Sequence, residues 1–80
     1  MGSFRLSARA RAQVHEIYDY SAVTFSTYQA NAYHAGLERT FGLLADFPRI
    51  GQLVGEIALG HRRFRFQAHH IFYTEDGTIS

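Results

Sequence analysis

The chain has 80 residues, a formal net charge of +1, an apolar content of 46% and no cysteine. This length holds a single domain, residues 1–80, and the apolar content indicates a globular fold rather than a disordered tail. The lack of cysteine excludes a disulfide framework and a thiolate zinc site. The small net charge argues against general electrostatic binding of nucleic acid.

No apolar stretch approaches the roughly 20 residues that a membrane-spanning helix needs, and the N-terminus lacks the apolar core of a signal peptide. We therefore expect a cytoplasmic protein. All eight cationic residues are arginine. Arginine favours planar, bidentate contacts at interfaces, although the codon preference of a GC-rich genome explains the same bias without any function.

The first half of the chain predicts a short strand and two helices. Phe4 to Leu6 suits a strand, and Ser7 can cap a helix that ends near Val23. Ser26 or Thr27 can cap a second helix, which Pro48 stops. Apolar residues recur at spacings of three and four in both segments, and the short connection makes them an antiparallel helical hairpin.

The second half predicts a small, mainly antiparallel sheet. Residues 48–60 form an irregular connection whose apolar side chains tuck under the sheet or form a short helical turn. Residues 61–73 are predicted to form the two strands of a hairpin. In the first strand Arg63 and Arg65 alternate with Phe64 and Phe66, which places the arginines on one face and the phenylalanines on the other. The partner strand is the aromatic and β-branched run from His69 to Tyr73. The fold class is therefore α+β, a helical hairpin packed on this sheet.

The end of the chain is expected to leave the sheet incomplete. Asp76-Gly77 is a strong signal for a tight turn, and a turn implies a returning strand. Only residues 78–80 remain to form it. We therefore expect the last strand to be missing and the edge of the strand at residues 69–73 to be unpaired.

Nearly the whole chain resembles the ParE branch of the RelE/ParE toxin superfamily. The stretches that carry the resemblance are FRLSARARAQVHEIYDYSA from Phe4, YQANAYHAGLERTFGLLADFPRIG from Tyr28, Arg62 to Phe64, and His70 to Tyr73. ParE-like proteins usually complete the sheet with a last strand of the type IxIxRVxH, from which this chain departs.

The resemblance implies the toxin of a bacterial type II toxin–antitoxin system. Such a toxin would inhibit DNA gyrase by binding, and a ParD-like antitoxin would neutralise it in a hetero-oligomer. Two alternatives stay open. One is a ribosome-dependent mRNA interferase of the RelE type, for which Arg63, Arg65, His70 and Tyr73 are suitable residue types. The other is an inactive module that only binds the antitoxin.

Two sets of residues are candidates for these contacts. Arg62, Arg63 and Arg65 would contact the target, although the same pattern suits the solvated face of an amphipathic strand. Antitoxin contact is expected at the open strand edge and at aromatic positions, namely Tyr18, Tyr28, Tyr33 and Phe72. We expect no cofactor and no metal site, because neighbouring His69 and His70 point to opposite faces of a strand.

Overall fold

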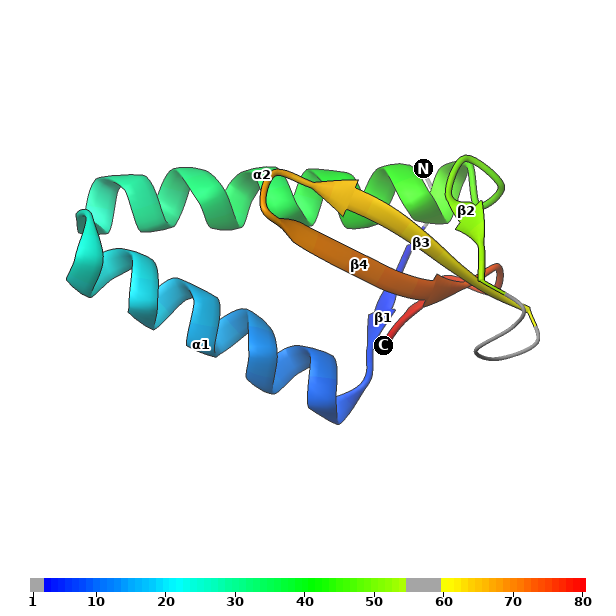
Figure 1. Ribbon diagram of the computed structural model, residues 1–80, viewed down its shortest axis with the longest axis horizontal. Coiled ribbons are helices and arrows are strands. Elements are labelled where there is room, and N and C mark those ends of the chain that lie inside the picture. The colour runs from blue at the N-terminus through cyan, green and yellow to red at the C-terminus, as the bar shows by residue number, and fades with distance from the viewer. Residues whose placement is uncertain (1–2, 55–59) are drawn as a thin grey trace.

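The computed structural model describes residues 3–54 and 60–80 as two helices and a five-stranded sheet (Figure 1). The helices are α1 (Ala8–Thr24) and α2 (Thr27–Asp46). The strands are β1 (Arg5–Leu6), β2 (Gln52–Leu53), β3 (His61–Phe66), β4 (His69–Thr74) and β5 (Thr78–Ile79). The predicted α+β class, with a helical hairpin against a mainly antiparallel sheet, is confirmed.

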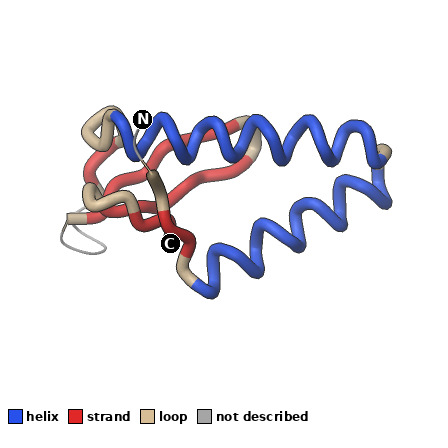
Figure 2. Tube along the Cα trace, turned by 180° about the vertical axis from the view of Figure 1, so that it is seen from behind, coloured by secondary structure: helices blue, strands red, loops and turns tan. Residues whose placement is uncertain are grey.

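Serine side chains start both helices. The Ser7 hydroxyl accepts a hydrogen bond from the Ala10 N–H at 3.0 Å, and the Ser26 hydroxyl accepts one from the Gln29 N–H at 3.0 Å. Each bond satisfies one of the amide groups that a helix leaves unpaired in its first turn. The helices form a hairpin whose closed end projects beyond the sheet (Figure 2).

The strand order is β1-β5-β4-β3-β2, with one parallel pair, β1 with β5, and three antiparallel pairs. Strand β2 was not predicted. It pairs with β3 through Leu53 and Arg62, and it leaves the side chains of Leu53 and Ile50 exposed. The prediction that this connection tucks its apolar residues under the sheet is right for Val54 and wrong for these two. Residues 55–59 lie outside the described residues.

The predicted open edge of β4 is partly closed. Ile79 of β5 pairs with Tyr73, and the Ser80 N–H donates to the Phe72 carbonyl oxygen at 2.8 Å. On its other side β5 pairs with β1. The expectation of a missing last strand is therefore corrected to a two-residue strand. Within the part of the chain that the structure describes, His69–Ile71 has no strand partner on that side.

The core lies between α2 and one face of the sheet. It contains Leu37, Phe41 and Leu44 from α2 and Ile71, Tyr73 and Ile79 from the strands. The first helix contributes little, because Ala10 is its single buried residue. The helices thus cover the face of β4 that carries Ile71 and Tyr73, and they leave the opposite face and one side of α1 open. Neither described helix is long and apolar enough to cross a membrane.

Candidate functional site

The face of the sheet that points away from the helices carries cationic and aromatic side chains. Arg63 of β3 lies opposite Phe72 of β4, and Arg65 lies opposite His70. Neither strand contains an acidic residue. We call Arg63, Arg65, His70 and Phe72 the outer sheet face. Its two guanidinium groups are not neutralised by a carboxylate on either strand, so the surface can receive an anionic partner.

Hydrogen bonds orient the two arginines of the outer sheet face. Arg63 Nη2 donates to Gln52 Oε1 at 3.0 Å, and Arg65 Nε donates to the Gln67 carbonyl oxygen at 2.8 Å. Each contact uses one of the five donors of a guanidinium group. The remaining donors of Arg65 lie on an exposed side chain.

Arg62 does not belong to this surface. Its side chain is 13% exposed and points to the helix side, where Nη1 donates to the carbonyl oxygens of Gly51 at 2.7 Å and Arg49 at 3.3 Å. Its Nε lies 3.6 Å from Glu75 Oε2. Of the three arginines predicted for target contact, Arg63 and Arg65 therefore lie together on the outer sheet face. Arg62 lies on the opposite face, where it binds the loop at residues 49–51. Strand alternation alone could have separated them, because Arg62 has the same parity as Phe64.

Tyr73 is also a structural residue. It is fully buried, donates its hydroxyl hydrogen to the Pro48 carbonyl oxygen at 2.7 Å and accepts from the Gly51 N–H at 2.9 Å. It lies directly opposite Arg62 in the β3–β4 ladder. These two neighbours hold residues 48–51 against the sheet. The four residues considered for RNA cleavage are thus divided between the two faces of the sheet, because Tyr73 is buried on the helix side and Arg63, Arg65 and His70 lie on the outer sheet face.

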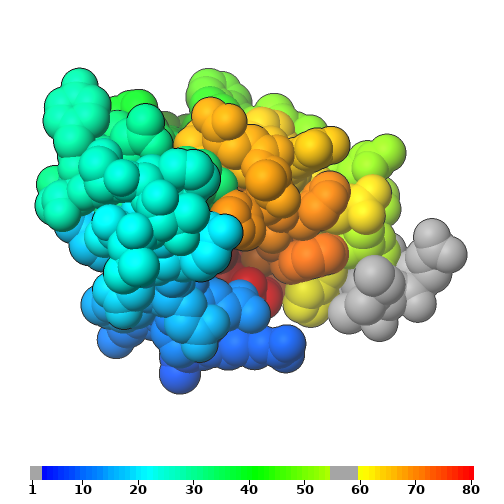
Figure 3. Space-filling view, turned by 60° about the vertical axis from the view of Figure 1, so that its left-hand side comes forward, coloured from blue at the N-terminus to red at the C-terminus, as the bar shows by residue number. Residues whose placement is uncertain are grey.

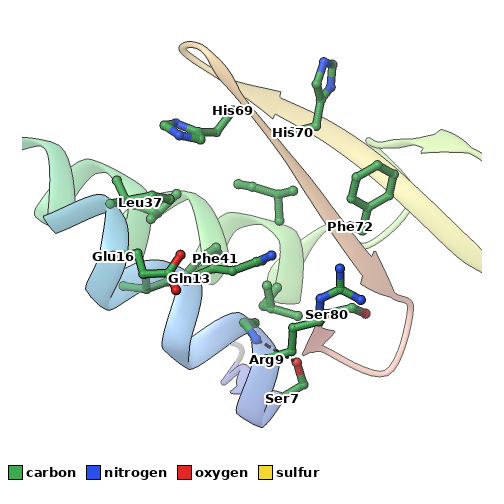
Figure 4. A pocket seen from close by; sticks show the side chains of 15 residues that line it. Ser7, Arg9, Gln13, Glu16, Leu37, Phe41, His69, His70, Phe72 and Ser80 are labelled. Atoms are coloured by element: carbon green, nitrogen blue, oxygen red, sulfur yellow. Dashed lines mark hydrogen bonds between the residues drawn. The ribbon is translucent and has the colours of Figure 1, made fainter. Parts of the chain in front are cut away.

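A groove of about 570 Å³ lies between α1 and β4 (Figure 4). Leu37 and Phe41 form its floor, and Val14 and Ile17 of α1 form one wall. We call it the α1–β4 groove; its polar lining residues include Arg9, Gln13, Glu16 and His69. An apolar floor with a polar rim is the usual form of a surface that buries part of a partner protein.

Unpaired backbone groups of β4 face the same groove. The backbone groups of alternate residues in an antiparallel strand point to the same side. Because the Phe72 carbonyl accepts from Ser80, the N–H and carbonyl of His70 also point toward the side that β5 leaves open. The groove therefore combines an apolar floor with a pairing edge for an extended segment.

The aromatic residues predicted for antitoxin contact do not form one surface. Phe72 belongs to the outer sheet face and also borders the groove. Tyr28 is 82% exposed at the closed end of the helical hairpin. Tyr18 lies between the helices, where its hydroxyl donates to Asn31 Oδ1 at 2.7 Å. The three residues thus lie in three different places.

Tyr33 lies where α2 meets the start of β4. Its hydroxyl is 2.5 Å from His69 Nδ1, and its ring makes an edge contact with Phe66 at a centroid distance of 5.2 Å. Burial raises the pKa of the Tyr33 hydroxyl above its ordinary value. Tyr33 therefore fixes the position of His69 beside the groove.

The two adjacent histidines diverge as predicted. Their rings point in different directions from β4 (Figure 4): His69 lies on the helix side, opposite Phe66, and His70 lies on the outer sheet face, opposite Arg65. Among residues 3–54 and 60–80, no cluster of three or more histidine, aspartate or glutamate side chains could hold a metal ion. The geometry offers two binding surfaces, the outer sheet face and the α1–β4 groove.

Comparison with known proteins identifies the family. Residues 4–79 match the family described as "ParE toxin of type II toxin-antitoxin system, parDE". A protein named Toxin ParE1 from Caulobacter vibrioides is 34% identical over 73 residues, which is 91% of this chain and 76% of that protein. Proteins of the same name from two strains of Mycobacterium tuberculosis are 35% identical over 78 residues, covering 95% of this chain and 80% of theirs. The chain belongs to the ParE toxin family of type II toxin–antitoxin systems.

Proposed function

We propose that this ParE-family toxin inhibits DNA gyrase by binding it, and that Arg63 and Arg65 of the outer sheet face make the contact. The observation that carries the proposal is the surface itself. Two hydrogen-bonded guanidinium groups and an exposed aromatic ring lie on the sheet face that points away from α1 and α2. Interfaces are enriched in such side chains.

Arg62 takes a smaller part in this proposal than the sequence pattern suggested. Its donors are directed at the carbonyl groups of residues 49 and 51, so it supports the sheet from the helix side. A mechanism by binding also agrees with the burial of Tyr73, whose hydroxyl already serves two backbone groups. The proposed mechanism requires only that the outer sheet face binds gyrase, and it needs no proton transfer by a side chain.

The antitoxin is proposed to be of the ParD type and to cover the α1–β4 groove. An apolar side chain of the antitoxin would lie on Leu37 and Phe41, and its backbone would pair with His70. Tyr33 supports this site from the side through its contact with His69. Phe72 lies at the border between the groove and the outer sheet face, so antitoxin bound in the groove would also hinder access to the arginines.

The experiment is a supercoiling assay with purified gyrase and the complete chain. The charge-reversed pair Arg63→Glu and Arg65→Glu should lose inhibition while retaining a native circular dichroism spectrum. The matched control reverses two exposed arginines of the helices, Arg11 and Arg39, and should inhibit as the wild type does. Full inhibition by the first pair would refute the assigned surface.

Absence of inhibition by the wild type would refute gyrase as the target. A ribosome-dependent mRNA cleavage assay would then test the RelE-type alternative, and lack of activity in both assays would favour an inactive antitoxin-binding module. Antitoxin binding is tested separately with a ParD-like antitoxin. Gln13→Trp, which fills the α1–β4 groove, should weaken binding, whereas Ala12→Trp on the exposed side of α1 should not.

A further inference from the structure

The closed end of the helical hairpin is an uncharged surface. From Tyr20 to Tyr33 the sequence contains no aspartate, glutamate, lysine, arginine or histidine. All 15 charged residues counted in the chain, eight basic and seven acidic, therefore lie outside this stretch. We call residues 20–33 the hairpin tip. A solvent-exposed helical hairpin normally carries charge on its outer side, so the tip resembles a contact surface more than a solvated one.

The tip also exposes large apolar side chains. The exposed fractions are 65% for Tyr20, 88% for Val23, 65% for Phe25 and 82% for Tyr28. The cyan and teal atoms of Figure 3 show this part of the chain as a lobe beside the orange atoms of β4. Single exposed apolar residues are common on protein surfaces, but a cluster of four within nine positions indicates an interaction site.

A pocket of about 470 Å³ opens next to these side chains. It is lined by tip residues, including Tyr20, Phe25 and Tyr33, by Ala68 between β3 and β4 and His69 of β4, and by Glu16 and Ile17 of α1. The hydrogen bond between Tyr33 and His69 joins its two walls. The tip thus presents protruding apolar side chains beside a recess that combines aromatic residues with the polar side chains of Glu16, Gln29 and His69.

We infer that two copies of this chain associate through their hairpin tips about a two-fold axis, the apolar side chains of each tip filling the recess of the other. A protrusion and a recess on the same patch allow a reciprocal, closed contact, whereas a protrusion and a recess on distant patches would produce open chains of molecules. Glu16 at the recess would meet apolar side chains of the other tip, and the tip residues that would meet across the axis carry no charge, so no identical charges face each other and a second copy is favoured as the occupant.

The size of the surface sets the expected strength of the dimer. A tip of fourteen residues is smaller than the 20–30 residues per partner, about 800 Å² each, that stable interfaces use. We therefore expect reversible association with a dissociation constant of about 10 µM to 1 mM. The free toxin would hide its apolar tip at high concentration and expose it on dilution.

Sedimentation equilibrium of the complete chain across this concentration range tests the inference. We expect a monomer–dimer equilibrium, and Tyr28→Glu should weaken it by at least tenfold because two carboxylates would then meet at the contact. Leu53→Glu is the matched control, since Leu53 is 63% exposed on β2 and away from the tip. A wild type that stays monomeric, assembles without limit, or is equally weakened by both variants would overturn the inference.

A second measurement does not depend on how glutamate affects folding. The chain has no cysteine, so a single Thr24→Cys variant carries its thiol at the exposed tip alone. A short bismaleimide should join two copies of it, and should join copies of the exposed Gln52→Cys control much less. Equal cross-linking of the two variants would contradict the tip contact. Loss of ParD-like antitoxin binding in Tyr28→Glu, with a monomeric wild type, would assign the tip to the antitoxin instead.

Discussion

Replacing Tyr73 with phenylalanine should destabilise the protein by about 2–4 kcal/mol. The variant keeps the buried ring and removes one oxygen, which serves the Pro48 carbonyl at 2.7 Å and the Gly51 N–H at 2.9 Å. Each hydrogen bond contributes about 0.5–1.5 kcal/mol, and a buried amide left unpaired costs about 1–3 kcal/mol. Gly51 is buried, so water cannot readily replace the lost acceptor.

This loss is large for so small a domain. A chain of 80 residues has a free energy of unfolding of about 4–12 kcal/mol in total. Each kcal/mol lowers the melting temperature of such a domain by about 4–8 °C, so Tyr73→Phe should melt at least about 8 °C below the wild type. Urea unfolding followed by circular dichroism measures the free energy directly.

Tyr18→Phe is the matched control for the Tyr73 prediction. It removes the same hydroxyl group from a hydrogen bond at the exposed boundary of the helices, where water can satisfy Asn31. Its expected cost is within about 0.5 kcal/mol. A Tyr73→Phe variant no less stable than this control would refute the role given to the hydroxyl. On the proposed mechanism, Tyr73→Phe should still inhibit gyrase below its melting temperature, since the Tyr73 hydroxyl is buried away from the outer sheet face.

Three further predictions test the roles of individual side chains and of one turn. Arg62→Ala should lower the free energy of unfolding by about 1–3 kcal/mol and Arg65→Ala by less than about 0.5 kcal/mol in urea melts, because only Arg62 holds inward-facing carbonyl groups; equal losses would contradict this division. Hydrogen bonds with the side chain of Thr74 and then with the side chain and backbone of Thr78 hold the pKa of the Asp76 carboxyl below its ordinary value of 3.8. The stabilisation by Asp76 is therefore present above that pKa and lost as the pH falls through the lower folded-state value, and Asp76→Asn should remove this part of the acid dependence of stability. Gly77→Ala should cost about 1–2 kcal/mol in thermal melts, since φ is +91° at this turn; an unchanged melting temperature would show that the turn can change conformation.

The helices could be predicted from the sequence because local interactions determine where they start. Ser7 and Ser26 cap helices that begin at Ala8 and Thr27, as their positions indicated. The β3–β4 hairpin could also be predicted, since the alternation of residue types separates Arg63 and Arg65 from Phe64 and Phe66. These are contacts between residues near one another in the chain, which a sequence pattern reports well.

The unpredicted features depend on long-range contacts. Gln52–Leu53 carries no strand signal of its own, and it becomes β2 by pairing with Arg62 and Arg63. Strand alternation places Arg62 on the helix side of the sheet, but its partners there, the carbonyl groups of residues 49 and 51, are long-range contacts that the local pattern does not reveal. The α1–β4 groove also combines residues of two helices and a strand, so the sequence indicated residue types and could not bring them together.

The pairing of β1 with β5 has a consequence for how the protein folds during synthesis. Arg5 and Thr78 are 73 positions apart, and within the described residues β5 is the sole strand partner of β1. Strand β1 therefore has no strand partner among the described residues until residues 78–79 have been synthesised and have left the ribosome. Long-range pairing of this kind is slow because a large loop must close first. Until then the strand order β1-β5-β4-β3-β2 cannot form, because β5 lies between β1 and β4.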